Sequence, residues 1–473
     1  MTEQEKQNIR EAFDKMVMPY RFGPKGADIT HVLSNAQKIY EEDYLRVIVS
    51  PPFRRMQDKA QVFPLESSDF IRTRLTHSLE VSHFGYAIGR IVEEQLHVRN
   101  LISEVAFKGH VISNILKVAG LIHDIGNTPF GHFGEQSFQE FYKNVQTRGE
   151  GDAVRRAFLS MTDVERLDLL HFDGNVQGLR VVKKLASANH TLSLDLTKAV
   201  IATIIKYPYD SVNGNARDSG NHCQEKFGYF DAEKSVYKNI IDSLGLLNHQ
   251  RHPLTYLLEA ADDIAYSVSD IEDGFSLQTM QLNDIQTALR NVHGHQLMED
   301  LEHYERGRQD VYVQQLRLRL QDKMVKDCAD YFISVFGQIV LDTYNHNPIL
   351  ESSNSGLLRM ATKELANNNF EDKRVIKHEL LGGQIVTRLL SMFSEAIFDE
   401  NLIDNNKFNT KCKSYKLYSL ISKGFKNVQC RTTNDIIPRT AYGKFLLIND
   451  FISGMTDSYA LRMYKELISG DIV

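Results

Sequence analysis

The chain has 473 residues, enough to bury a large core divided into about three domain-sized units. Hydrophobic residues make up 42% and charged residues 25%, with 10 prolines, which excludes a disordered, collagen-like or disulfide-built protein. The net charge of −6 excludes a general attraction to nucleic acid, so any such binding would need a local basic patch.

The N-terminal segment and the cysteines both predict the cellular compartment. The N-terminal segment is charged and helix-forming, unlike a signal peptide, and no apolar run of about 18 residues predicts a membrane span. The four cysteines are scattered and form no C-x-x-C pair, which is typical of free thiols in a reducing compartment. We therefore expect a cytoplasmic protein without a membrane anchor.

Helical periodicity dominates the predicted elements. In chain order, residues 45–50 are the best candidate for a strand because they are rich in β-branched side chains. Apolar stripes predict helices over 76–88 and 103–126, and a third over 253–268 that opens with a proline. We predict an all-α fold with at most short β elements.

Two segments break the regular pattern. Residues 207–228 hold many turn formers and few aliphatic side chains, which predicts a long surface loop. Such loops are often lids over active sites, although plain insertions are comparably common. Residues 298–325 form a highly charged helical run, interpreted as a spacer between a catalytic half and a C-terminal helical half.

Several polar residues lie beside apolar stripes. His77 shares a stripe with Val81 and Phe84, so it faces the interior, where a hydrogen-bonded core histidine is the alternative. His123 and Asp124 follow another buried stripe. A His-Asp dipeptide alone is weak evidence for a site.

The helix predicted from residue 253 carries a polar ridge. Asp262, Tyr266 and Asp270 fall at i, i+4 and i+8. A solvated helix face is the alternative, yet Leu258 and Ala265 place Asp262 at the border of the core. A half-buried carboxylate requires a partner, and a cation is the simplest one.

Two histidines and two aspartates would give a mixed nitrogen and oxygen ligand set made of His77, His123, Asp124 and Asp262. This set suits Mn²⁺, Fe, Co²⁺ or Zn²⁺, with Mg²⁺ less ideal and Ni²⁺ a further candidate. A six-coordinate ion would retain room for water and a phosphate oxygen, and would polarise a phosphoryl group.

His132 and Glu135 lie three residues apart in the stretch PFGHFGE. If a helix begins near Gly131, both side chains lie on one face within reach of each other. A histidine oriented by a carboxylate suits acid/base catalysis. The alternative is a glutamate that stabilises its own helix N-terminus.

With these residues in place, the chain resembles the bacterial deoxyguanosine-triphosphate triphosphohydrolase family of the HD superfamily. Six blocks match in order, from residue 43 almost to the end, so the resemblance is very specific. The blocks are DYLRVIVSPPFRRMQDKAQVFPL (43–65), RTRLTHSLEV (72–81), GLIHDIGNTPFGHFGE (120–135), HFDGNVQGLR (171–180), PLTYLLEAADDIAYSVSDIEDG (253–274) and NDFISGMTDSYA (449–460).

The resemblance implies a domain arrangement and a reaction. An HD-domain catalytic core over 1–290 would include the 207–228 loop, and a C-terminal helical region over 291–473 would complete the substrate pocket and the oligomer contacts. The implied reaction cleaves dGTP or other deoxynucleoside triphosphates to deoxynucleoside and tripolyphosphate, by water attack at the α-phosphorus. Base preference is not implied, because 207–228 and 400–445 resemble the family only loosely.

Residue roles follow from the same resemblance. The metal ligands would be His77, His123, Asp124 and Asp262, with Mn²⁺ or Mg²⁺ as cofactor. His132 and Glu135 would be the catalytic pair. Phosphate contacts would come from Arg74, Lys206 and Tyr207, and the sugar and phosphate pocket from Gln61, Asn175, Tyr266 and Asp270. Tyr266 under a ring without a 2′-hydroxyl would select deoxyribose, and Asp270 would accept from the 3′-hydroxyl.

Two alternative functions stay open. One is an HD-type phosphatase or phosphodiesterase that acts on another nucleotide. The other is a non-catalytic sensor of nucleotides or single-stranded DNA, which predicts a damaged metal set, whereas all four ligands and the His132/Glu135 pair are intact.

A basic stretch near the C-terminus suggests further partners. From Asn405 to Asn434 no acidic residue occurs, while seven lysines and arginines, the last of them Arg431, alternate with aromatic residues. Single-stranded nucleic acid sites use this combination, as would a neighbouring subunit's pocket or an allosteric nucleotide site; a solvated face with inward aromatics is the alternative. Some family members form hexamers or tetramers and respond to single-stranded DNA or nucleotides, so the resemblance implies a homo-oligomer with such an effector.

Overall fold

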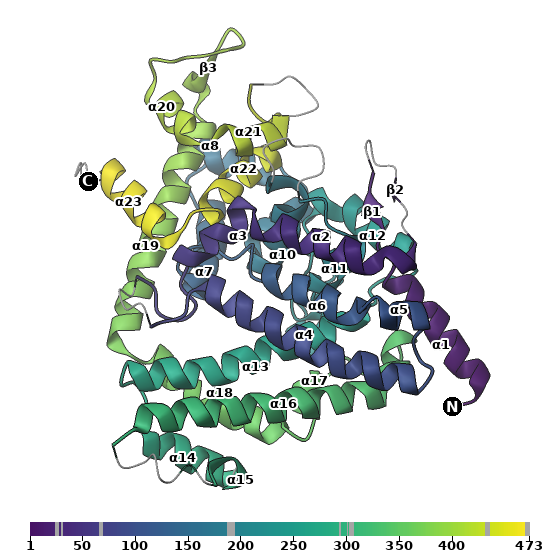
Figure 1. Ribbon diagram of the computed structural model, residues 1–473. Helices are drawn as coiled ribbons and strands as arrows, with labels where there is room; N and C mark the ends of the chain where they lie inside the picture. Colours follow the sequence, from purple (N-terminus) through teal and green to yellow (C-terminus); the bar gives the residue numbers. More distant parts are fainter. Residues whose placement is uncertain are drawn as a thin grey trace.

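The computed structural model describes residues 1–23, 28–29, 32–65, 70–186, 194–292, 295–299, 301, 307–430 and 436–468. Within these ranges the fold is almost entirely helical, which confirms the all-α prediction (Figure 1). The strands of this part form two antiparallel pairs, β1 (Arg21–Phe22) with β2 (Asp28–Ile29) and β3 (Ile403–Asp404) with β4 (Lys407–Phe408). None of the helices described is long and apolar enough to cross a membrane.

The helices share the amphipathic pattern that the sequence predicts. In chain order they are α1 (Glu3–Met16), α2 (Ala36–Ile48), α3 (Pro51–Arg55), α4 (Arg74–Val98), α5 (Glu104–Lys108), α6 (Val111–Ile122), α7 (Gly131–Gln146), α8 (Ala153–Leu159), α9 (Asp163–Leu170), α10 (Gly174–Arg180), α11 (Lys198–Ile204), α12 (Lys234–Leu244), α13 (Pro253–Ser276), α14 (Leu282–Asn291), α15 (His295–Met298), α16 (Gln309–Val340), α17 (Ile349–Ser352), α18 (Gly356–Phe370), α19 (Lys373–Ile397), α20 (Lys413–Leu420), α21 (Lys423–Cys430), α22 (Ala441–Ser453) and α23 (Asp457–Ile468).

Two large hydrophobic cores organise these helices. In the first, α4 packs against α6, α13 and α16, and the long helices α4, α13 and α16 run side by side (Figure 1). In the second, α7 packs against α19, and α22 contributes a nearly continuous apolar face. Each core draws on both halves of the chain, so the division into domains at residue 290 stays a prediction.

Two local predictions were wrong in detail. Residues 45–50 were expected as a strand, but 45–48 form the end of α2, where Ile39, Asp43 and Val47 are buried at helical spacing. The helix expected over 103–126 is broken into α5 and α6, because His110 adopts a left-handed conformation with φ of 48°. Its predicted start is correct, since the Ser103 hydroxyl accepts from the Ala106 amide.

The loop and the charged run differ in how they are built. Residues 207–228 form the predicted loop, apart from short 3₁₀ turns at Arg217–Ser219 and His222–Gln224. The charged run is more than a spacer, because its part within α16 packs Tyr312, Leu316 and Leu320 into the first core. Residues 300 and 302–306 of that run lie outside the described residues, as does Arg431.

The contact between α4 and α6 is unusually close. A Cβ atom at Gly89 would lie 2.6 Å from the Ser113 Cα atom, and one at Gly120 would lie 2.6 Å from the Ser82 Cα atom. Side chains at these glycines would therefore push the two backbones apart. This close approach brings the start of α4 next to the end of α6, where polar residues of both helices meet.

We expect Gly89→Ala to lower the free energy of unfolding by about 1–3 kcal/mol, because the new methyl group meets backbone that cannot move aside. This steric cost outweighs the gain of about 1 kcal/mol in helix propensity. Urea denaturation followed by circular dichroism measures the change. Gly149→Ala is the matched control, since a Cβ there has no atom within 4 Å, and it should change stability by less than about 0.5 kcal/mol. Equal stabilities of the two variants would contradict the close contact.

Candidate active site

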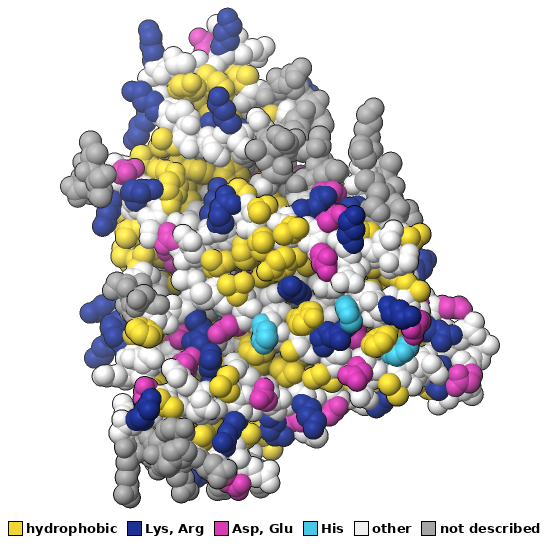
Figure 2. All heavy atoms as spheres, in the orientation of Figure 1, with side chains coloured by type: hydrophobic (Ala, Val, Ile, Leu, Met, Phe, Trp, Pro, Cys, Tyr) yellow, Lys and Arg dark blue, Asp and Glu magenta, His cyan; other side chains and the backbone are white. Residues whose placement is uncertain are grey.

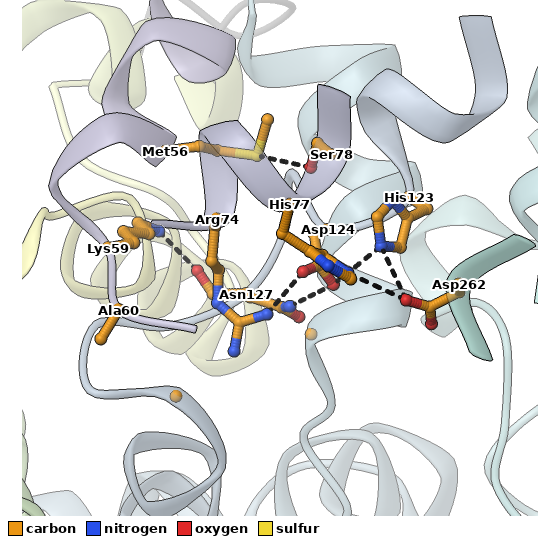
Figure 3. Close-up of polar contacts among 12 residues, drawn as sticks. Met56, Lys59, Ala60, Arg74, His77, Ser78, His123, Asp124, Asn127 and Asp262 are labelled. Atoms are coloured by element: carbon orange, nitrogen blue, oxygen red, sulfur yellow. Dashed lines mark hydrogen bonds and ion pairs between the residues drawn. The ribbon is translucent and has the colours of Figure 1, made fainter. Parts of the chain in front are cut away.

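Four polar side chains meet where α4, α6 and α13 converge (Figure 3). His77 comes from the first turn of α4, His123 and Asp124 follow α6, and Asp262 lies in the middle of α13. Asp262 Oδ1 lies 2.9 Å from His77 Nε2 and 3.5 Å from His123 Nε2. One potential ligand atom from each of His77, His123 and Asp124 lies within 4.8 Å of the others. The structure thus brings all four predicted metal ligands together.

The donor atoms of this cluster suit a divalent cation. His123 Nδ1 donates to the Gly120 carbonyl at 2.8 Å, which directs Nε2 towards the carboxylates. That Nε2 atom is buried and has no hydrogen-bond partner among the described residues. A buried imidazole nitrogen that lies between two carboxylates without a hydrogen bond is the arrangement that a metal ion completes.

The pKa values of His123 and Asp124 also indicate a cation site. Burial lowers the pKa of His123, but the charges of Asp124 and Asp262 outweigh it and raise the pKa to about 9. Burial raises the pKa of Asp124, but Arg74 and His123 outweigh it and lower the pKa to about 2. The cluster therefore holds ionised carboxylates that attract a proton onto His123, and a metal cation at this place would replace that proton.

Asp124 is held by two neighbours besides the histidines (Figure 3). Arg74 Nη1 donates to Asp124 Oδ2 at 2.6 Å, and Asn127 Nδ2 donates to Asp124 Oδ1 at 2.5 Å. The neighbouring carboxylate Asp263 points elsewhere and forms an ion pair of 2.6 Å with Arg359. The geometry thus distinguishes Asp262 from Asp263, which helical periodicity alone leaves open.

A cavity of about 210 Å³ opens beside this cluster. His132 and Glu135, in the first turns of α7, line it, and His132 Nδ1 lies 3.3 Å from Glu135 Oε2. Glu135 is buried, and its other oxygen accepts from the Gly174 amide at 2.7 Å. A Cβ at Gly174 would lie 2.5 Å from that oxygen, so only glycine lets this amide reach it. The hydrogen bond to Glu135 raises the pKa of His132.

The cavity is also lined by three cations, Arg74, Lys206 and Lys226. Lys206 Nζ lies 3.2 Å from Glu259, a carboxylate that both terminal nitrogens of Arg251 bind at 2.7 and 2.9 Å. Burial lowers the pKa of Lys206, but Glu259 outweighs it and raises the pKa, so the ammonium stays charged. Such a set of cations suits a polyanionic ligand.

Most predicted site residues share this cavity. Those that line it are Gln61, Arg74, His123, Asp124, His132, Glu135, Asn175, Lys206, Tyr207, Asp262 and Tyr266. His77 and Asp270 are absent from the lining: His77 is buried and contacts Asp262, and Asp270 lies one turn beyond Tyr266 on α13. One oxygen of Asp270 has no hydrogen-bond partner among the described residues, and burial raises the pKa of this carboxyl well above its usual range.

Sequence reasoning missed five polar residues of the lining, which are Asn127, Thr203, Lys226, Thr255 and Glu259. Asn127 stands only three residues after Asp124, a spacing that suggests a side chain returning to the preceding turn. Lys226 lies in the predicted loop, and its ion pair with Asp173 spans 53 residues of sequence, so no local pattern indicates it. Glu259 lies on α13, where helical periodicity alone does not distinguish it from a residue of a solvated helix face.

Comparison with known proteins identifies relatives over almost the whole chain. The HD domain family matches residues 74–206. A deoxyguanosinetriphosphate triphosphohydrolase-like protein of Listeria monocytogenes is 35% identical over 92% of this chain and 94% of the relative. A protein of the same description from Synechocystis is 31% identical over 90% and 92%. A deoxyguanosinetriphosphate triphosphohydrolase of Salmonella arizonae is 28% identical over 94% and 96%.

The matched HD domain spans α4 to α11 and contains three of the four residues of the cluster, while Asp262 comes from α13. The relatives cover both hydrophobic cores in addition to this domain. With this coverage and an intact His-Asp cluster, the chain belongs to the deoxyguanosinetriphosphate triphosphohydrolase family of HD-domain proteins.

Proposed function

We propose that this protein is a metal-dependent hydrolase that cleaves dGTP and other deoxynucleoside triphosphates to deoxynucleoside and tripolyphosphate. The observation that carries the proposal is one cavity that joins a His-Asp metal cluster, a His-Glu pair and three cations. The cations provide charge complementary to a triphosphate, and the metal cluster lies beside the His132/Glu135 pair. The printed names of the relatives support the same activity.

The catalytic steps are assigned to the chain's own side chains. A bound divalent ion would polarise the α-phosphate and lower the pKa of a water molecule. Glu135, fixed by the Gly174 amide, orients His132 through Nδ1 and leaves Nε2 facing the cavity. His132 then exchanges the proton at the attacking or leaving oxygen, and Arg74, Lys206 and Tyr207 hold the phosphates.

Selection of the sugar is assigned to α13. Tyr266 lines the cavity next to the metal cluster, its ring centroid 5.8 Å from that of His77. A ring packed against Tyr266 would leave little space for a 2′-hydroxyl, which favours deoxyribose. Asp270, one turn further, supplies a buried acceptor for the 3′-hydroxyl, and Gln61 and Asn175 complete the pocket.

Further parts of the proposal concern the cell and the assembly. We propose Mn²⁺ or Mg²⁺ as the metal, a cytoplasmic location in keeping with four free cysteines, and a homo-oligomer, a hexamer or tetramer.

Single-stranded DNA or a deoxynucleoside triphosphate is the proposed effector, because Lys426 lies 4.3 Å above the Tyr418 ring beside Phe408 and Tyr415. In Figure 2 the end of the molecule with β3 and α20 exposes lysines and arginines around hydrophobic side chains.

The activity is tested by incubating the protein with Mn²⁺ and each of the four deoxynucleoside triphosphates, with and without single-stranded DNA. We expect deoxynucleoside and tripolyphosphate as products, and His132→Ala should lower kcat by about 10²–10⁴-fold, the usual contribution of an acid/base group. His83→Ala, an exposed histidine on α4, is the matched control and should be unchanged. Pyrophosphate or orthophosphate as first product would favour another HD phosphohydrolase, and no product at all would favour a sensor.

The metal site is tested on protein freed of metal with EDTA. Mn²⁺ should raise the melting temperature, because an ion that binds only the folded state at 100 times its Kd stabilises it by about 2.7 kcal/mol. Asp262→Asn should weaken Mn²⁺ affinity by at least about 100-fold, because altering even an outer-shell partner costs 10–100-fold. Asp263→Asn is the control, since Asp263 pairs with Arg359, and should bind nearly as wild type. An equal loss of Mn²⁺ affinity in both variants would contradict the ligand assignment. The same titration repeated with Mg²⁺, Co²⁺, Ni²⁺, Zn²⁺ or Fe²⁺ ranks the metals by affinity.

The pH profile tests the His132/Glu135 pair. Glu135 raises the pKa of His132, so the imidazole stays protonated to higher pH than usual. If His132 acts as a base, activity rises with pH as the imidazole loses this proton. Glu135→Gln removes the negative charge that raises the pKa of His132. The ascending limb of the plot of kcat against pH should therefore move to lower pH, and its plateau should fall about tenfold or more. An unmoved limb with a lower plateau would show that another group titrates there.

A further inference from the structure

A turn of eight residues connects the metal cluster with the His-Glu pair. It runs from Asp124 to Gly131, and Phe130 and Gly131 both have a φ of 62°. A left-handed conformation is sterically unfavourable for a residue with a side chain, so Phe130 requires contacts that hold it. The position of His132 relative to Asp124 depends on the shape of this turn.

Two buried charged side chains from distant parts of the chain hold the turn, one at its middle and one near its end. Lys59 is buried, and its ammonium donates to the Asn127 carbonyl and, at 2.8 Å, to the Ser453 carbonyl at the end of α22 (Figure 3 shows the first contact). Asp457, the first residue of α23, accepts from the Phe130 amide at 2.9 Å with one oxygen. With the other it accepts from the Ala60 amide at 3.0 Å.

We propose that Lys59 and Asp457 are positioning residues that lock the turn of 124–131 onto the C-terminal helices and so fix the distance between the metal cluster and the His132/Glu135 pair. Neither side chain is among the residues that line the cavity, and both are bound to backbone groups of other segments. Lys59 acts through Asn127, whose side-chain amide holds Asp124. Asp457 acts through Phe130, whose left-handed backbone starts the helix of His132 and Glu135.

The same two residues also hold residues 59–61, a strip that carries a residue of the proposed substrate pocket. Asp457 binds the Ala60 amide, Ala60 pairs with Thr73 in a β-bridge, and the Arg74 amide donates to the Lys59 carbonyl at 3.0 Å. This strip includes Gln61, which lines the cavity. A shift of the α22–α23 junction would therefore move groups on two sides of the cavity together.

The variants Lys59→Met and Asp457→Asn test the lock, since both keep the approximate shape and remove hydrogen bonds. Because the kinetic readout rests on the proposed triphosphohydrolase activity, hydrogen exchange of the peptide over 124–131 gives a readout that does not. We expect exchange there to become at least about tenfold faster while most of the molecule is unchanged. In the kinetic assay kcat should fall about 10–100-fold with KM within about twofold, because a misplaced group costs rate more than binding. The Mn²⁺ titration should show about tenfold weaker binding.

Matched controls separate a lock from a general loss of stability. Lys198→Met removes another fully buried lysine, which donates to Ser243 at 2.7 Å. Asp43→Asn alters another buried carboxylate that accepts from a backbone amide, that of Thr197 at 2.9 Å. These variants should lower the melting temperature without altering exchange over 124–131 or kcat. If folded Lys59→Met or Asp457→Asn shows wild-type exchange there, or if the controls show the same exchange and kcat changes, the proposal is overturned. If either test variant fails to fold, the other carries the test alone.

Discussion

The close approach of α4 and α6 is the constraint on which the site depends. Gly89 and Gly120 let the two backbones come almost into contact, and no larger residue fits at either place. Because both helices are rigid over several turns, this contact determines where the first turn of α4 and the end of α6 lie. His77 and His123 are consequently neighbours, with ring centroids 5.3 Å apart. The metal cluster is thus a result of helix packing, to which α13 adds Asp262.

Bringing these groups together creates a charge problem that a cation resolves. Asp124 and Asp262 are both held as carboxylates next to each other, and Arg74 compensates only part of their charge. Charged groups out of contact with water are costly unless they are paired. The rest of the negative charge attracts a proton onto His123, whose Nε2 lies between the two carboxylates. When His123 is a neutral imidazole the cluster keeps a negative charge, which promotes binding of a divalent ion in place of the proton.

Parts of this arrangement could be predicted from the sequence because they follow local rules. The apolar stripe that includes His77 and the border position of Asp262 result from helical periodicity, and α13 begins at the proline that suggested it. The break at His110 could not be predicted, because a non-glycine residue in a left-handed conformation is stabilised by its tertiary surroundings. The strand expected over 45–50 failed because β-branched residues enter helices when their burial follows helical spacing.

Other features depend on contacts that no local pattern encodes. Lys226 in the cavity lining pairs with Asp173, which lies 53 residues earlier, and Lys59 binds Ser453 almost 400 residues further along the chain. The resemblance to the triphosphohydrolase family did include the block 449–460, but it did not assign a task to Asp457. Only the fold shows that this carboxylate accepts from the backbone amides of both Ala60 and Phe130.

The site also lies at the junction of the two hydrophobic cores, and this has a mechanical consequence. The proposed metal ligands are fixed by helices of the first core, whereas α7, which carries His132 and Glu135, packs its apolar face into the second core. Any displacement of one core relative to the other would change the spacing between the His-Asp cluster and the proposed acid/base pair. A buried ion pair opposes such displacement: Arg180 at the end of α10 donates to both oxygens of Asp450 in α22, at 2.6 and 2.7 Å. Breaking a buried pair of this kind costs about 3–5 kcal/mol, which opposes movement of α10 relative to α22. The C-terminal helices are therefore part of the catalytic framework, although none of their residues lines the cavity described here.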